Sequence, residues 1–144
     1  MVDYVLDTEP LVAFLYDEPG HEAVAEVLER VASGAADGLL AEVNASELLY
    51  LVARIEGVDG TATDASLRTA DRDVRALTRH GLELARADWA LAGRVKAHGG
   101  IALGDAHAVA LAHEHDATLL AGADGEFDEL PVEVTVERFR DHGV

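Results

Sequence analysis

The chain has 144 residues, of which 28 are acidic and 11 basic, and it contains no cysteine. This length predicts one compact domain over residues 1–144, and the hydrophobic content of 49 % supplies its core and excludes a disordered chain. The lack of cysteine excludes disulfides and thiolate metal sites, and we find neither a long apolar run nor a signal peptide. A cytoplasmic protein is therefore expected.

The charge balance is the unusual feature of the composition. The formal net charge is −17, and lysine occurs only once, at Lys96, the other basic residues being arginine. Such an acidic surface resembles proteins of salt-accumulating halophiles and suggests a haloarchaeal source, with an acidic mesophilic protein as the alternative. Because self-repulsion at this charge opposes compaction unless salt screens it, we expect folding to need molar salt.

The first part of the chain alternates between strand and helix patterns. The predicted elements are a strand at 4–6, a helix capped by Asp7 or Thr8, a helix at about 21–32, a strand at 39–41 and a helix from Asn44 to about Ile55. Asn44 is predicted to cap the last helix because Glu47 follows three residues later, as in a relaxed capping box. Glu47 would then lie in the first turn of that helix.

The same alternation continues to the end of the chain. The predicted elements are a helix from Thr61 or Thr63 to about His80, a strand at 82–85, helices at 89–97 and 103–115, a strand at 117–121, a turn or short helix after Asp124, a strand at 132–136 and a helical turn at 137–142. Short apolar strands between helices predict an α/β fold, with a parallel sheet covered by helices on both faces.

Four acids are candidates for a functional site. Three of them are expected near strand ends or helix starts at one edge of the sheet, where such a fold places its site beyond the carboxyl ends of the strands. Asp7 and Asp124 follow predicted strands, whereas Glu47 and Asp105 lie near helix starts. Carboxylates crowded into one crevice repel each other, and a hard divalent cation such as Mg²⁺ relieves that repulsion. Taken singly, each acid is also explained by helix capping or by the helix dipole.

Four stretches, in this order, carry a family resemblance: VLDTEPLVA at 5–13, ASELLY at 45–50, LGDAHAVALA at 103–112 and ATLLAGADGEF at 117–127. With them the chain resembles PIN-domain nucleases, in particular the VapC-type toxins of toxin–antitoxin pairs. The resemblance implies a three-layer α/β/α fold around a five-stranded parallel sheet. It also implies a requirement for Mg²⁺ or Mn²⁺, cleavage of structured RNA, an antitoxin partner and a homodimer.

On this resemblance, Asp7, Glu47, Asp105 and Asp124 take the metal-binding roles. Asp7, Glu47 and Asp105 would hold one ion, while Asp124 would hold a second ion or orient water. A metal-activated water would attack the phosphorus and leave a 5′-phosphate and a 3′-hydroxyl. Asp128, one turn beyond Asp124, is either a fifth acid or a solvated turn residue.

The chain departs from the family pattern at two positions. Gly122 stands where the family usually has Ser or Thr two residues before its fourth acid, and Glu9 stands where it often has Ser two residues after its first. Both departures affect the expected polar surroundings of the acids, and Thr8 remains as a hydroxyl that could hydrogen-bond near the expected metal.

The helix predicted at about 61–80 offers an arginine face. Its arginines follow spacings of four, three and four, opposite an apolar stripe of Leu67, Ala70, Val74 and Leu77. These arginines are Arg68, Arg72, Arg75 and Arg79. They are either RNA contacts, since phosphate contacts supply most nucleic-acid affinity, or a solvated face with Asp64–Arg68 and Asp71–Arg75 pairs.

Three other functions remain open at this point. A catalytically weak member of the same fold would only bind a partner, and an RNA-processing nuclease would share the chemistry without being a toxin. A magnesium-dependent phosphatase or receiver-type domain is the third alternative. A haloacid-dehalogenase-like phosphatase requires Asp two residues after its first Asp, where this chain has Glu9. A receiver domain requires a lysine after its last strand, and the single lysine here is Lys96.

Overall fold

The computed structural model describes residues 1–122 and 125–140, and its centre is a five-stranded parallel sheet. The strands are β1 (Tyr4–Leu6), β2 (Gly38–Ala41), β3 (Glu83–Ala85), β4 (Thr118–Ala121) and β5 (Thr135–Arg138). Their order across the sheet is β3-β2-β1-β4-β5, and each neighbouring pair is parallel. The predicted five-stranded parallel sheet is confirmed.

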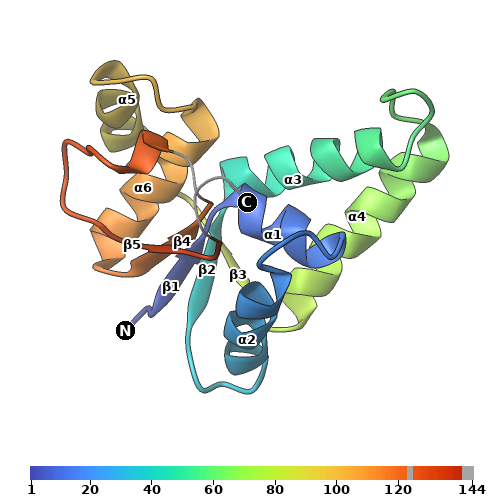
Figure 1. The fold of residues 1–144 in the computed structure, drawn as a ribbon, viewed down its shortest axis with the longest axis horizontal. Helices are drawn as coiled ribbons and strands as arrows, with labels where there is room; N and C mark the ends of the chain where they lie inside the picture. Colours follow the sequence, from blue (N-terminus) through green and yellow to red (C-terminus); the bar gives the residue numbers. More distant parts are fainter. Residues whose placement is uncertain (123–124, 141–144) are drawn as a thin grey trace.

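Helices cover both faces of this sheet (Figure 1). One layer holds α1 (Thr8–Leu15), α2 (His21–Ala32), α3 (Glu42–Ile55) and α4 (Asp64–Arg79). The other holds α5 (Trp89–Ala97) and α6 (Leu103–His115), with the short 3-10 helix η1 (Gly125–Phe127) after β4. Among the described residues, no helix is long and apolar enough to cross a membrane.

The three layers follow from the alternation of side chains along the strands, because successive residues of a strand point to opposite faces. On β1, Val5 belongs to the core cluster under α5 and α6, whereas its neighbour Leu6 belongs to the cluster under α1 to α4. Leu39 and Leu40 of β2 divide in the same way. The predicted three-layer α/β/α architecture is therefore confirmed.

The start of α3 differs from the prediction. Strand β2 runs directly into α3, so the helix begins at Glu42, with Ala41 as its N-cap residue and no side-chain cap. Asn44 is therefore not a cap but the third residue of the helix, and it is fully buried. Glu47 consequently lies in the second turn of α3. Because no loop separates β2 from α3, Asn44 cannot be the N-cap residue. Its side-chain amide makes other contacts instead.

The C-terminal part differs as well. The last strand is shifted to Thr135–Arg138, and the predicted helical turn is wrong for residues 137–140, because 137 and 138 belong to β5. This strand lies at the sheet edge and its side chains alternate between exposed and half-buried, so it lacks the apolar run that marks the inner strands. Residues 141 and 142 lie outside the described residues.

Helix α4 begins where predicted but buries a different first residue. Thr63 and Ser66 form a reciprocal capping box, and the buried stripe runs through Ser66, Ala70, Val74 and Leu77. Leu67, predicted for that stripe, is 42 % exposed. The capping box turns Ser66 inward, so Leu67 lies beside the buried stripe.

Candidate functional site

A small pocket at the carboxyl end of β1 brings together most of the predicted acids. Its volume is about 200 Å³, and it is lined by Asp7, Thr8, Glu9, Glu47, Leu51, Asp105 and Phe127. We call this the carboxylate pocket. It joins the end of β1 and the first turn of α1 to α3 and α6, which are far apart in sequence. Asp124, the fourth predicted acid, lies outside the described residues.

Asp7 and Asp105 are in direct contact in this pocket. Burial is the main reason that the pKa of Asp7 is raised from its ordinary value of 3.8, and the charges of Glu47 and Glu9 raise it further, while hydrogen bonds to Asp105 and to the Thr8 backbone lower it. Burial also raises the pKa of Asp105, and the charge and hydrogen bond of Asp7 add to this. Without a cation, the pair therefore keeps a proton at pH values at which two isolated carboxylates would both be ionised.

Glu47 lies beside this pair and is oriented by a hydroxyl. The Thr8 hydroxyl donates a hydrogen bond to Glu47 Oε1. A Cβ built on Gly104 would lie 2.9 and 3.0 Å from the two carboxylate oxygens of Glu47. The glycine before Asp105 thus leaves the space that the Glu47 carboxylate occupies, which brings Glu47 next to the start of α6.

Asn44 is a site residue that the sequence reasoning missed. Its Nδ2 donates to Gly104 O at 3.1 Å, to Thr8 Oγ1 at 3.1 Å and, more weakly, to Asp7 Oδ1 at 3.4 Å. Its Oδ1 is buried and has no hydrogen-bond partner among the described residues. Asn44 precedes Glu47 by one helical turn, and this spacing indicates a shared helix face once the residue is not assigned as a cap.

Glu126 is a second missed residue. Its carboxyl hydrogen-bonds Asp105 and contributes to the raised pKa of that residue, and its Oε1 accepts the backbone N–H of Ala102 at 3.2 Å. Glu126 follows Asp124 by two residues, so the acid-x-acid spacing is the sequence pattern that points to it. It ties the segment after β4 to the start of α6.

The pocket does not by itself form a closed metal cage. Within residues 1–122 and 125–140, no group of three or more His, Cys, Asp or Glu side chains is gathered so that it could hold a metal ion. Asp7 and Asp105 touch, and Glu47 lines the same pocket, but metal binding by these acids stays a prediction. Asp128 does not line the pocket, and its carboxylate accepts a hydrogen bond from Arg138 at 2.5 Å.

The predicted arginine face lies on α4, and all four arginines are exposed. Arg75 pairs with Asp71 at 3.0 Å, as predicted for the solvated face, and Arg72 pairs with Asp73 at 3.2 Å. Helix α4 contributes no lining residue to the carboxylate pocket. RNA contact by Arg68, Arg72, Arg75 and Arg79 therefore stays a prediction.

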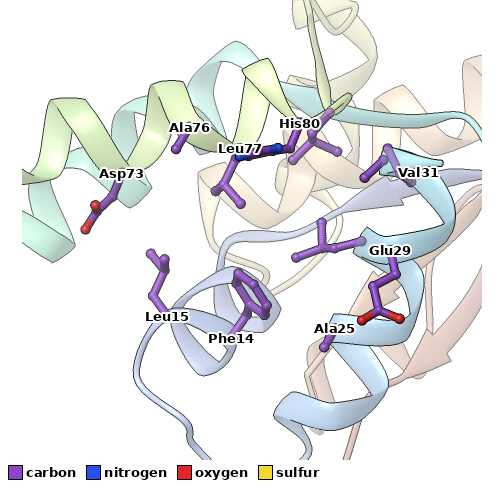
Figure 2. Close-up of a pocket in the computed structure, with 12 residues that line it drawn as sticks. Phe14, Leu15, Ala25, Glu29, Val31, Asp73, Ala76, Leu77 and His80 are labelled. Carbon is purple, nitrogen blue, oxygen red and sulfur yellow. The ribbon is translucent and has the colours of Figure 1, made fainter. Parts of the chain in front are cut away.

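A second hollow lies between α1, α2 and α4 (Figure 2). Its volume is about 310 Å³, and it is lined by Phe14, Leu15, Ala25, Leu28, Glu29, Val31, Ala32, Asp73, Ala76, Leu77, His80 and Leu82. We call this the apolar groove. Most of its lining is aliphatic or aromatic, and Glu29 and Asp73 are its acidic members.

Comparisons with known proteins agree with this architecture. The family model described as "PIN domain" matches residues 4–133. The structure of VapBC2 from Rickettsia felis bound to a promoter DNA fragment is similar, with a TM-score of 0.69 and 17 % identity over 96 % of this chain and 98 % of that one. No curated protein sequence matches the chain.

Two further structures have the same fold. DNA-bound VapBC from Salmonella typhimurium has a TM-score of 0.70 and 13 % identity, over 97 % of this chain and 100 % of that one. FitAcB from Neisseria gonorrhoeae has a TM-score of 0.60 and 16 % identity, over 94 % of this chain and 97 % of that one. At these identities the likeness concerns the fold.

Proposed function

Because the chain belongs to the PIN-domain family, we propose that it is a divalent-metal-dependent endoribonuclease that cleaves structured RNA and acts as the toxin of a toxin–antitoxin pair. One observation carries the proposal. Asp7, Glu47 and Asp105 come from three distant segments and line one pocket beyond the end of the central strand. Ligand sites of open α/β sheets lie at such strand ends.

The donor set is of the kind that Mg²⁺ or Mn²⁺ binds. The polar side chains that line the pocket carry only oxygen donors, and hard divalent cations prefer carboxylates and water. Asp7 and Asp105 are both largely removed from water and lie in contact. A cation would relieve the repulsion between their negative charges. The buried, unpartnered Asn44 Oδ1 is an acceptor that an ordered water of such a site would satisfy.

In this proposal Asp7, Glu47 and Asp105 hold one ion, and Asp124 holds a second ion or orients water. When bound, the ion supplies an activated water and stabilises the charge that develops on the phosphodiester. Thr8 orients the Glu47 carboxylate through its hydroxyl, and Asn44 holds Thr8 and the first turn of α6 at Gly104. Hydrolysis by water leaves a 5′-phosphate and a 3′-hydroxyl.

The test is RNA cleavage by the wild type, Asp7→Asn and Asp105→Asn in Mg²⁺ and in chelator. We expect each substitution, and the chelator, to lower the cleavage rate at least about 100-fold, since each removes stabilisation of transition-state charge. Asp17→Asn is the matched control, because the Asp17 side chain is 86 % exposed and does not line the pocket. Cleavage that persists in chelator, or products ending in a 2′,3′-cyclic phosphate, would refute the proposed chemistry.

We further infer an antitoxin partner that covers the apolar groove with an apolar segment. The similar structures are complexes named VapBC and FitAcB. An apolar groove between helices is a surface into which an apolar segment of a partner can pack. The proposed homodimer and the proposed cytoplasmic location rest on the family resemblance and on the composition. An RNA-processing nuclease would share the carboxylate pocket but would not bind an antitoxin encoded by a neighbouring gene.

A further inference from the structure

The two positions at which the sequence departs from the family pattern lie against each other in the structure. A Cβ built on Gly122 would lie 1.6 Å from Oε2 and 2.3 Å from Cδ of Glu9. The Glu9 carboxylate therefore occupies the space that a side chain at position 122 would fill. Gly122 is buried, and its φ is not among the positive values found at other glycines, so the backbone itself does not demand glycine there. The Glu9 carboxylate, and not the backbone conformation, leaves no room for a side chain at position 122.

Arg140 holds the Glu9 carboxylate in this place. Its Nη2 donates to Glu9 Oε1 at 2.5 Å, and its Nη1 donates to Pro19 O at 3.3 Å. The guanidinium also lies over the Phe139 ring, 4.7 Å from the centroid, and the Arg140 side chain is only 17 % exposed. With its guanidinium fixed on three sides, Arg140 restricts the positions that the Glu9 carboxylate can adopt.

The carboxylate so positioned belongs to the proposed active site. Glu9 lines the carboxylate pocket together with Asp7, Glu47 and Asp105, and its charge contributes to the raised pKa of Asp7. We propose that Glu9 is a further acid of this pocket, which takes the place of the side chain missing at Gly122, is oriented by Arg140 and strengthens divalent-cation binding. This inference rests on the proposed function of the pocket.

The charge of Glu9 is tested apart from its shape by Glu9→Gln. The amide fills the same space and its oxygen still accepts from Arg140, so the fold is retained while one negative charge is lost. Because cation affinity in oxygen-ligand sites depends on the ligand charge count, we expect Mn²⁺ to bind roughly three- to tenfold more weakly. Free Mn²⁺ is measured by electron paramagnetic resonance during titration of the full chain, all variants being in the same buffer.

Glu42→Gln is the matched control. Glu42 also pairs with an arginine, Arg86, at 3.4 Å, but it does not line the carboxylate pocket. It changes the net charge by the same amount, so a general effect of the acidic surface would weaken Mn²⁺ binding equally in both variants. Equal effects of Glu9→Gln and Glu42→Gln would overturn the inference, as would a Glu9→Gln affinity equal to that of the wild type.

The shared space is tested by Gly122→Ala. The new methyl group displaces the end of a flexible side chain rather than backbone, so we expect the chain to fold and Glu9 to leave the pocket. Mn²⁺ affinity should then fall to the level of Glu9→Gln, and the double variant should bind no more weakly than either single one. Additive losses, or wild-type affinity in Gly122→Ala, would overturn the inference.

Melting curves in chelator complete the experiment. Glu9→Gln should melt within about 2 °C of the wild type, because it removes a charge and leaves the packing unchanged. A much larger fall together with weaker Mn²⁺ binding would mean that Glu9 acts through the fold, which contradicts the proposal. A wild type that binds no Mn²⁺ would refute the proposed function and this inference together, whereas equal binding by Glu9→Gln refutes this inference alone.

Discussion

Helix α1 contributes to two hollows of opposite character. Thr8 and Glu9 at its start line the carboxylate pocket, whereas Phe14 and Leu15 near its end line the apolar groove. The pocket gathers acids from segments that are far apart in the sequence, and the groove gathers the apolar sides of three helices. The pocket therefore depends on strand order, while the groove depends mainly on helical periodicity.

The two hollows also differ in the kind of ligand that would stabilise them. Buried carboxylates that touch each other are stabilised by a cation or by a proton. The large apolar side chains of the groove are buried or half-buried, and an apolar partner would complete their removal from water. The two hollows should therefore respond to different changes. Charge, salt and pH should act on the carboxylate pocket, whereas apolar-to-charged substitutions should act on the apolar groove.

Salt should have the largest effect, because it acts on the whole acidic surface as well as on the pocket. With a net charge of −17, the folded chain repels itself, and at about 1 M salt the Debye length falls to about 3 Å. We expect the melting midpoint to rise by more than about 10 °C between 0.1 and 2 M KCl, which is roughly 3 kcal/mol for a domain of this size. Equal midpoints at the two concentrations, measured by circular dichroism, would contradict this.

A charge placed in the groove should separate the two hollows. We expect Leu28→Glu to weaken binding of the neighbouring-gene antitoxin at least about 100-fold, since a buried unpaired charge is unfavourable, while RNA cleavage is retained. Leu67→Glu is the matched control, because Leu67 is 42 % exposed and lies outside the groove. Isothermal titration calorimetry measures the affinity, and a variant that loses cleavage and partner binding together would argue against two separate surfaces.

The arginine face provides a third region against which both hollows can be compared. Changing Arg68, Arg72, Arg75 and Arg79 to Ser should weaken RNA binding about tenfold and make it less dependent on salt, because phosphate contacts release counterions. The Mg²⁺-induced rise in melting temperature should be unchanged, since α4 does not line the pocket. RNA affinity and salt slope equal to those of the wild type would identify the arginines as a solvated face.

The pH dependence of the cation-free protein should show a smaller effect. The pKa values of Asp7 and Asp105 are raised in the folded chain, so the folded state binds more protons than the unfolded state above pH 3.8. Stability is then lost as pH rises. In chelator at pH 8, Asp105→Asn should melt about 3–5 °C above the wild type and depend less on pH. A lower midpoint for Asp105→Asn would contradict the repulsion between the two acids.

Much of the fold could be predicted because it is encoded locally. Residues 21–32 have the helical spacing of a buried face, and α2 has these bounds. Apolar runs predicted the inner strands β1, β2 and β4, which are covered on both faces. The edge strand β5 was predicted two to three residues too early, because all of its side chains except Val136 are polar and its position is fixed by pairing with β4.

The site could be predicted only in part, because its details depend on contacts between distant residues. Asp7, Glu47 and Asp105 were found from their places beside strands and helices and from the family resemblance. Asn44 has the spacing of a helix cap, and only the direct junction between β2 and α3 shows that it lies inside. Likewise, no local pattern indicates that Glu9 fills the space at Gly122.

Anomalous diffraction from crystals of the full chain grown with Mn²⁺ would show whether Asp7, Glu47 and Asp105 share a cation. We expect an anomalous peak in the carboxylate pocket, with oxygen atoms of Asp7, Glu47 and Asp105 around it, directly or through water. Crystals with Mn²⁺ at other sites and none between these acids would contradict the proposal that the three carboxylates share a cation.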